Sequence, residues 1–509
     1  MGAPRSCLTM PSQDIHRAIV IGSGFGGAVA ALRLAERGIE TLVIERGRCW
    51  DQPIEGKTDI FPPLAGRDIR QAWRSRNHPL VPGMWRTKNR KFPGLLQRIE
   101  GKGVTVICGA AFGGGSVVYG GMMVRPEPAD FDRIFDTTLR YRDLADHYDT
   151  VERMIGLETA PPDILAHDRF KSVPRFEADA RVAGFGAQLH RVKTAVDWAR
   201  IADELAGRQP ASAINGEAVM GFNSRAMKSL DKNYLRQAQT AKVPIRARLH
   251  TVVESIHRTG TTEDPVYRLS CVDIGAKGTG TTRFELAAKN VFLCAGSMNT
   301  TPLLLRAKEQ ALPRLSHRIG HGWGTNGDVL MSRVALPGSA VSFKLADSKL
   351  KWRQAAPPTS SLYFNDGPSP IRIIHTPGPD IRRRALRHLG MSMPRSLGRF
   401  VKHDDDYRVE WSSDNDAWGI AEVRKKLDAI SDAAGGRVRK PWLGNATYHP
   451  LGGVVLSDAT DAYGRLQPYK GLYVVDSSLI PGHTACCNPA WTVAALAEYC
   501  MENILARDF

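Results

Sequence analysis

Residues 17–45 decide the fold and run RAIVIGSGFGGAVAALRLAERGIETLVIE. The apolar residues 18–21 predict a buried strand, and residues 28–37 predict a helix that ends at Gly38. A second apolar run, residues 41–44, predicts another strand, which ends at Glu45. A strand, a glycine-rich turn, a helix and a strand in this order predict a βαβ unit of the kind that binds dinucleotides.

The glycines and the acid of this unit match what a dinucleotide requires. Gly22 permits the tight turn, Gly24 lets the backbone approach a pyrophosphate, and Gly27 lets the helix lie close to the strand. Glu45, 23 residues after Gly22, is placed to accept hydrogen bonds from a ribose diol, and its charge disfavours the 2′-phosphate of NADP. The unit by itself does not distinguish NAD from FAD.

Composition places the chain among ordinary globular proteins. It has 509 residues, 42% of them hydrophobic, and a net charge of +17, which is compatible with nucleic acid, an anionic membrane surface or an acidic ligand. The most apolar early stretch is interrupted by glycines and Arg33, and residues 1–16 lack the apolar core of a secretory signal, so we expect a cytoplasmic protein without a transmembrane helix. The eight cysteines lack zinc-ligand spacing, so we expect reduced thiols and no metal. A vicinal disulfide between Cys486 and Cys487, or a metal held by them with His483, is a minor alternative.

Further motifs follow the βαβ unit in order along the chain. They are a second glycine-rich loop, GGGSVVYGGM at residues 113–122, a histidine motif, YHPLGG at residues 448–453, and the pair GLYVVDSSLIPG and NPAWTVAALAE at residues 471–482 and 488–498. Shorter ones are SLDKNYL at 229–235, AGS at 295–297 and GWGTNG at 322–327. Together these motifs resemble the glucose–methanol–choline (GMC) family of FAD oxidoreductases, and in particular its branch of bacterial cholesterol oxidases with non-covalent FAD.

The resemblance implies an α/β fold, α+β overall, in which a Rossmann-like FAD-binding domain is interleaved with a substrate domain built on an antiparallel sheet covered by helices. We expect the FAD-binding domain to comprise residues 14–48, 103–122, 226–324 and 445–509. The substrate-binding domain would then comprise residues 49–102, 123–225 and 325–444, and the similarity is weakest between about residues 336 and 437.

The resemblance also implies non-covalent FAD and assigns residues to it. A helix that begins near Pro489 would put backbone N–H groups where negative charge develops on a reduced flavin. The family positions that bind the cofactor correspond to Gly22, Gly24, Gly27 and Glu45 at the ADP half, Val252 at the adenine, Gly114, Gly115 and Met122 along the isoalloxazine, and Asp476, Asn488 and Pro489 around the flavin.

Two polar residues are candidates for the chemistry, His449 and Asn488. An alcohol becomes a carbonyl by losing a hydride from carbon and a proton from oxygen, and histidine is suited to manage a proton near neutrality. In the family, the residues at these two positions hold the substrate hydroxyl against the flavin. A nucleophile elbow, a Walker A motif and an HExxH motif are absent from the sequence, so hydrolase and nucleotidase functions are not supported.

The sequence departs from the sterol oxidases at two places. Aligning SSLYFNDGPSP, residues 360–370, with the family loop that carries an isomerising glutamate puts Asn365 at that position, and asparagine cannot act as the base. Asp366 is adjacent, but a one-residue offset in an extended segment points to the opposite side. Tyr119 replaces an asparagine near the oxygen-facing side of the flavin and either alters oxygen access or fills space. We therefore expect weak or absent isomerisation and a broader substrate class of bulky apolar secondary alcohols.

Basic residues concentrate in two segments, residues 70–91 and 382–399. The second segment predicts an amphipathic surface helix, because its apolar residues alternate with arginines at loosely helical spacing. These apolar residues are Ile381, Leu386, Leu389 and Met393. Such a face would be an ordinary solvated surface or a peripheral contact with an anionic membrane. No motif supports nucleic-acid binding.

The function predicted from the sequence is FAD-dependent oxidation of a sterol-like or terpenoid secondary alcohol to a ketone, with hydride transfer to flavin N5 and with O2 or another electron acceptor reoxidising the flavin. Two alternatives remain open. One is a GMC-fold flavoprotein with non-oxidative or photochemical chemistry, such as a lyase or decarboxylase. The other is a basic lipid-surface protein with a vestigial flavin site.

Overall fold

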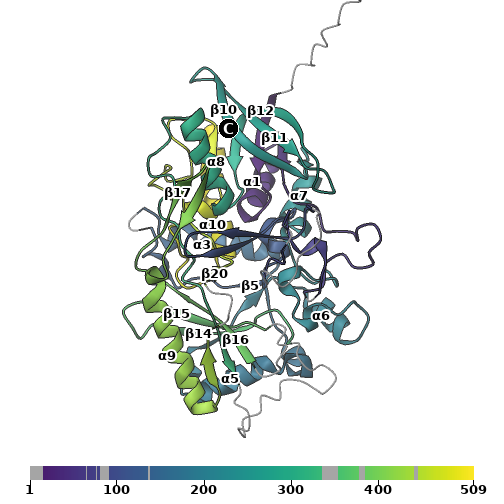
Figure 1. Cartoon of the computed structure of the whole chain (residues 1–509), viewed down its shortest axis with the longest axis vertical. Coiled ribbons are helices and arrows are strands. Elements are labelled where there is room, and N and C mark those ends of the chain that lie inside the picture. Colours follow the sequence, from purple (N-terminus) through teal and green to yellow (C-terminus); the bar gives the residue numbers. More distant parts are fainter. Residues whose placement is uncertain are drawn as a thin grey trace, which may run out of the picture.

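Two β-sheets organise the chain, one in each half of the molecule (Figure 1). The computed structural model describes residues 15–64, 66–75, 77–80, 91–135, 138–334, 354–377, 385–440 and 445–509. The two sheets and the helices on them give the mixed α/β architecture expected from the sequence, so the predicted fold class is confirmed.

The first sheet has seven strands and contains the predicted βαβ unit. Its centre is β1 (Ile15–Ile21), which pairs in parallel with both β2 (Thr41–Ile44) and β12 (Thr282–Leu293). Ile21 is aligned with Ile44 on one side and with Leu293 on the other, so all three strands end at one edge. The remaining strands are β9 (Arg246–Arg248), β10 (Thr251–Gly260), β11 (Pro265–Asp273) and β21 (Leu472–Val474).

Helix α1 (Phe25–Glu36) follows the glycine-rich turn and packs against α10 (Pro489–Asp508) and α7 (Tyr234–Thr240). Arg33 on α1 donates two hydrogen bonds, of 2.6 and 2.7 Å, to the buried carboxylate of Glu498 on α10. Helix α10 also packs against α3 (Tyr141–Ile155), and α8 (Ser297–Gln310) packs against β10. The C-terminal helix is thereby fixed against the dinucleotide-binding unit.

The second sheet has six strands, all antiparallel to their neighbours. Helices α5 (Ser172–Val182) and α9 (Ala417–Ala434) cover one face, where Ile371 and Ile373 pack with Phe176 and Leu427. Side chains alternate along a strand, so Arg372 and Ile374 lie on the opposite face. In order across the sheet, the strands are β19 (Arg437–Arg439), β13 (Val329–Val334), β16 (Ala385–Ser392), β15 (Ile371–His375), β14 (Ser360–Phe364) and β7 (Leu189–Arg191).

The predicted amphipathic helix near residues 381–393 is wrong. Residues 385–392 form β16, an interior strand between β13 and β15, and residues 381–384 lie outside the described residues. Both faces of an interior strand are covered, so its apolar residues do not alternate with polar ones as they do in a half-exposed strand. For this reason the apolar positions of the segment resembled a helical pattern. Within β16, Leu386 and His388 are fully buried, so this part of the segment offers no helical surface to a membrane.

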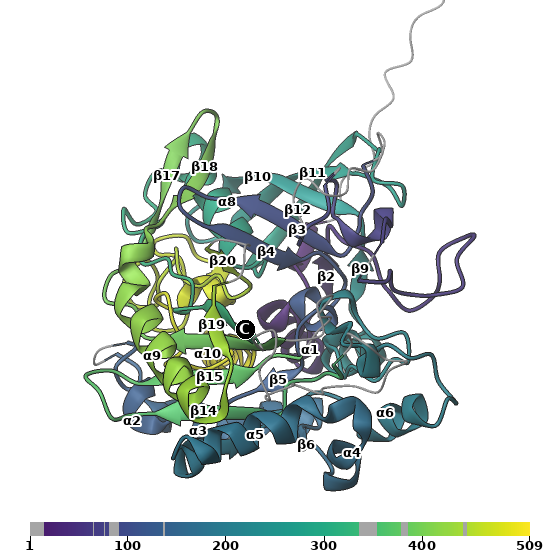
Figure 2. The same cartoon turned by 60° about the horizontal axis from the view of Figure 1, so that its bottom comes forward.

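Three smaller sheets and several short helices complete the described part of the chain (Figure 2). In a three-stranded sheet, β20 (Ala446–Thr447) pairs with β4 (Thr105–Gly109), which pairs with β3 (Leu96–Glu100). In the described part of the chain, no helix is long and apolar enough to cross a membrane. Other short elements are β5 (Met122–Met123), β6 (Glu158–Thr159), β8 (Lys193–Thr194), the β17–β18 hairpin (Arg399–His403 and Asp406–Glu410), α2 (Pro128–Phe131), α4 (Pro162–Ala166) and α6 (Trp198–Leu205).

Candidate functional site

Ser23 joins the three parts of the dinucleotide-binding region. Its hydroxyl donates to the Glu45 carboxylate at 2.6 Å and accepts from the backbone N–H of Gly113 at 3.1 Å. Glu45 also accepts from the N–H of Gly47 at 2.8 Å and is buried. The first glycine-rich turn, the acid and the second glycine-rich loop therefore form one connected surface. Ser23 was not among the predicted residues, although it lies inside the motif that predicted the unit.

Two of the predicted glycines border open space, while their neighbours are tightly packed. A Cβ added at Gly24 or at Gly115 would meet nothing within 4 Å. A Cβ at Gly27 would lie 2.0 Å from the Gly22 carbonyl oxygen, and one at Gly114 would lie 2.5 Å from the Gly24 Cα. Helix α1 begins directly after Gly24 and offers free N–H groups there. The residues present fit a dinucleotide, for which Gly24 and the start of α1 would offer backbone N–H groups to the pyrophosphate and Gly115 would leave room.

Val252 and Asp476 both lie near the dinucleotide-binding unit. The N–H of Thr251 donates to the Glu45 carbonyl at 3.0 Å, which places Val252 on β10 beside the acid. Asp476 follows β21, and its carboxylate accepts from the N–H groups of Gly296 and Ser478, both at 2.8 Å. Burial raises the pKa of Asp476, and these bonds act against that rise. Asp476 therefore ties the end of β21 to the start of α8.

His449 is held by a buried carboxylate. Its Nδ1 lies 2.9 Å from Oδ1 of Asp328, whose side chain is 1% exposed, while the histidine side chain is 17% exposed. The second oxygen of Asp328 accepts from the Thr447 hydroxyl at 2.8 Å, which fixes the carboxylate. A carboxylate at Nδ1 favours the tautomer that leaves the lone pair on Nε2. Within the described part of the chain, Nε2 has no hydrogen-bond partner.

A second carboxyl lies next to this pair. Asp416 is buried and accepts a hydrogen bond of 2.5 Å from the Thr325 hydroxyl, whereas its Oδ1 has no partner among the described residues. Burial raises the pKa of Asp416 to about 6, and the charge of Asp328 adds to the effect. Asp328 and Asp416 thus form a small acidic centre behind His449.

Asn488 begins α10 with an unused side chain. It occupies the N-cap position but makes no capping bond, and its Oδ1 is buried without a hydrogen-bond partner in the described chain. Pro489 is the first residue of the helix. Preceding Asn488, the Cys487 carbonyl accepts from the side chain of Asn326 at 2.8 Å. A buried amide oxygen without a partner indicates a ligand, because such a group costs free energy when it is left unpaired.

Residues 325–328 bring the two candidate catalytic residues into one site. Asn326 holds the segment before Asn488, Asp328 holds His449, and the Thr325 carbonyl accepts from Thr447 at 3.1 Å. Sequence reasoning missed Asp328 and Asn326. The GWGTNG motif ends one residue before Asp328 and was the only signal that could have found them.

The two departures from the sterol oxidases occupy different surroundings. Tyr119 packs edge-on against Phe25 of α1, with ring centres 5.7 Å apart, and its hydroxyl is buried without a partner among the described residues. Asn365 is exposed directly after β14, and Asp366 forms an ion pair with Lys426. Tyr119 therefore borders the cofactor region, whereas Asn365 and Asp366 lie at the protein surface.

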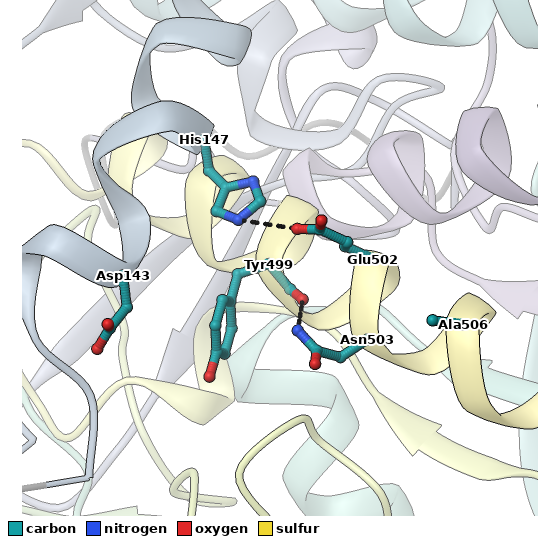
Figure 3. Close-up of a pocket in the computed structure, with 6 residues that line it drawn as sticks. All are labelled: Asp143, His147, Tyr499, Glu502, Asn503 and Ala506. Atoms are coloured by element: carbon teal, nitrogen blue, oxygen red, sulfur yellow. Dashed lines mark hydrogen bonds and ion pairs between the residues drawn. The ribbon is translucent and has the colours of Figure 1, made fainter.

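Neither the alternative cysteine chemistry nor a surface hollow beside α10 marks the site. Cys486 and Cys487 are both buried free thiols, and the described residues contain no cluster that could hold a metal. A hollow of about 460 Å³ lies between α3 and α10 and is lined by His147, Tyr499 and Glu502 (Figure 3). It lies about three helical turns, or roughly 16 Å, along α10 from Asn488. This hollow is separate from the site around His449.

Comparison with known proteins agrees with this geometry. The chain is similar to cholesterol oxidase of Acinetobacter baumannii, at 26% identity over 96% of this chain and 94% of that protein, and to paromamine 6'-oxidase of Streptomyces fradiae, at 23% identity over 96% and 91%. Among solved structures, it resembles a fungal aryl-alcohol oxidase, with a TM-score of 0.66 at 12% identity over 97% of this chain and 99% of that chain. Pyridoxine 4-oxidase from "Mesorbium loti" gives a TM-score of 0.59 at 16% identity over 97% and 100%. The models of the N- and C-terminal parts of GMC oxidoreductases match residues 16–320 and 402–497, and the chain therefore belongs to the GMC oxidoreductase family of FAD-using flavoproteins.

Proposed function

We propose that this protein oxidises a bulky, largely apolar secondary alcohol to a ketone, with non-covalently bound FAD as the hydride acceptor and O2 as the final oxidant, which is reduced to H2O2. The observation that carries the proposal is the arrangement of His449, whose Nδ1 is held by buried Asp328 while its Nε2 has no partner in the described chain. The unpaired Oδ1 of Asn488 supports it. The oxidase names of the relatives support the choice of O2.

The cofactor would be held mainly by backbone. The ADP half would be held by Gly22, Gly24, Gly27, Glu45 and Val252. The ring system would be lined by Gly114, Gly115 and Met122. Asp476, Asn488 and Pro489 would close around it. Bound FAD would supply a hydride acceptor at flavin N5.

His449 would manage the proton of the alcohol. The lone pair on Nε2 accepts a hydrogen bond from the substrate hydroxyl, and the ring takes the proton as the carbinol carbon loses its hydride. The resulting positive charge is stabilised by Asp328, whose carboxylate already accepts from Nδ1. Asp328 is thus a positioning residue, because it acts through His449.

Asn488 would fix the orientation of the hydroxyl. Its side-chain amide can donate to the substrate oxygen, or its Oδ1 can accept from the substrate hydroxyl. Because the hydroxyl has a single hydrogen, which His449 accepts in the reactive complex, the amide donates to the carbinol oxygen at that stage, and the C–H bond then has a defined direction. The apolar surroundings include Met122, Ile374 and Met391, which form one buried cluster with Cys487.

Anaerobic reduction of the flavin tests the proposal. Purified yellow protein mixed with a secondary alcohol under argon should lose its visible flavin absorbance, and air should restore it with formation of H2O2. The His449→Gln variant should keep its flavin and its melting temperature but reduce at least a hundredfold more slowly, since general base catalysis contributes about 10²–10⁴ in rate. Flavin that no alcohol reduces, or a His449→Gln variant of normal activity, would contradict the assignment.

A further inference from the structure

Arg372 is a buried cation for which the described chain provides no ion pair. It lies on β15, is 4% exposed, and donates a hydrogen bond of 3.2 Å from Nη1 to the Ser361 hydroxyl. Its guanidinium also lies within hydrogen-bonding reach of the neutral Cys487 thiol. Its Nε is buried and has no partner in the described part of the chain. The burial of a charge without a counter-charge is strongly unfavourable. A counter-charge from outside the chain would remove that cost.

The side chain lies on the face of the second sheet that meets the candidate site. Across the sheet, Arg372 is aligned with Tyr363 on β14 and with Met391 on β16. Met391 belongs to the buried cluster that contains Met122 and Cys487, and its sulfur lies 3.4 Å from the side-chain nitrogen of Asn326. Asn326 in turn holds the backbone just before Asn488, so Arg372 lies beside the residues assigned to the substrate.

Asp130, an acid on the other side of the Tyr363 ring's hydroxyl, is engaged by that tyrosine. The guanidinium of Arg372 lies 4.7 Å from the centre of the Tyr363 ring, and the Tyr363 hydroxyl donates at 2.5 Å to Asp130. Asp130 accepts this hydrogen bond from the tyrosine, and within the described part of the chain it makes no ion pair with Arg372. Burial raises the pKa of the Cys487 thiol to about 11 and the guanidinium acts against that rise, which agrees with the closeness of the two groups.

We propose that Arg372 binds a carboxylate of the substrate, so that this enzyme acts on secondary alcohols that combine an apolar body with an acid group. The inference rests on the proposed function and narrows its substrate class. It also gives a role to Arg372 that the sterol resemblance does not, because a sterol has no charge to pair with a buried guanidinium.

The chemistry of the site favours a carboxylate over a dianion such as phosphate. The planar guanidinium can present Nε and one terminal nitrogen to a carboxylate in a two-bond fork. A single buried cation balances one negative charge, whereas a second charge would stay uncompensated. Around it, Ile374, Met391 and Met122 suit the apolar part of such a substrate.

Benzoate binding tests the anion site without turnover. Sodium benzoate added to the yellow holoenzyme should perturb the visible flavin spectrum with saturation, and neutral benzamide should do so at least tenfold more weakly. The Arg372→Met variant should bind benzoate at least tenfold more weakly. Arg399→Met is the matched control, since Arg399 is a 60% exposed arginine on the β17–β18 hairpin, and it should bind benzoate normally.

Matched substrates test the same point by rate. Mandelate and lithocholate are secondary alcohols that carry a carboxylate, and their methyl esters lack the charge and are larger by one methyl group. In the wild type, at least one acid should reduce the flavin with a kcat/KM at least tenfold above that of its ester. In Arg372→Met the preference should disappear, and in Arg372→Lys it should fall because lysine keeps the charge but not the fork.

The stability of the same variants separates a binding role from a structural one. Arg372→Met should retain its FAD and melt at or above the wild-type temperature, because it removes an uncompensated buried charge. A variant that melts several degrees lower or loses FAD would assign Arg372 to the fold or the cofactor and overturn the proposal. If Arg372→Met cannot be purified, equal benzoate affinity in Arg372→Lys and the wild type would overturn it as well.

The two proposals fail in different ways. Equal rates for acids and esters, with benzoate affinity unchanged in Arg372→Met, would overturn the carboxylate site while alcohol oxidation stands. The opposite result is that benzoate binding depends on Arg372 but no alcohol reduces the flavin. This result would support the carboxylate site and contradict the proposed function.

Discussion

Replacing Asp328 by asparagine tests how His449 is prepared for catalysis. Asp328 touches His449 and Thr447 and no proposed substrate atom, so its contribution passes through the imidazole. Asparagine has nearly the same shape but no charge. Its amide can donate to Nδ1, which would move the ring proton to Nε2 and block the base.

The expected size of the effect follows from the geometry. Nδ1 and Oδ1 are 2.9 Å apart, and the carboxylate is 1% exposed, so solvent screens the pair weakly. With about 4 Å between the centres of charge and an effective dielectric constant near 20, the attraction is about 4 kcal/mol. If the whole attraction develops as the ring becomes positive, its loss lowers kcat roughly a thousandfold.

Stopped-flow reduction of the flavin by an alcohol measures this effect directly. In Asp328→Asn, kcat should fall about a thousandfold, while KM should change little because the residue does not contact the substrate. Asp328→Glu should recover part of the rate, since it restores a carboxylate. Asp458→Asn is the control, because Asp458 pairs with Arg318 at the surface. An Asp328→Asn enzyme that keeps a third or more of the wild-type kcat would refute the reasoning.

Three further predictions concern cofactor binding, stability and product. Gly24→Val should fold but bind FAD at least tenfold more weakly, as measured by flavin titration of the apoprotein, because its side chain enters open space. Gly26→Ala should instead lower the free energy of unfolding by about 3 kcal/mol, because its Cβ would lie 1.8 Å from a carbonyl oxygen; equal melting of the two variants would contradict this contrast. The pKa of Asp416 is raised from 3.8 to about 6, so ionisation of this carboxyl destabilises the fold as pH rises through that range. In denaturant titrations, the free energy of unfolding of Asp416→Asn should therefore exceed that of the wild type by roughly 3 kcal/mol above pH 7 and by little below pH 4. With exposed Asn365 at the aligned position, a 5-ene-3β-hydroxysteroid should give the unconjugated ketone, and appearance of the conjugated enone as fast as oxidation would overturn this expectation.

The sequence predicted the dinucleotide-binding half well because its signals are local. The glycines, the helix and Glu45 lie within 29 consecutive residues, and each has a physical requirement that a neighbour in the sequence reveals. The same locality explains the wrong helix at residues 381–393. An interior strand such as β16 is covered on both faces, and nothing in its own sequence shows which strands lie beside it.

The sequence by itself therefore predicted the GMC oxidoreductase family, through ordered motifs that resemble those of the family. The domain boundaries and the roles of His449 and Asn488 stay predictions. Only the tertiary structure decided what lies next to them. Asp328 is 121 residues before His449, and Arg372 is aligned with Met391, whose sulfur contacts the Asn326 side chain that holds the backbone just before Asn488. Ion pairing and burial depend on such long-range neighbours. The local sequence pattern therefore could not predict that Asp328 holds His449 or that the buried guanidinium of Arg372 lies near the site.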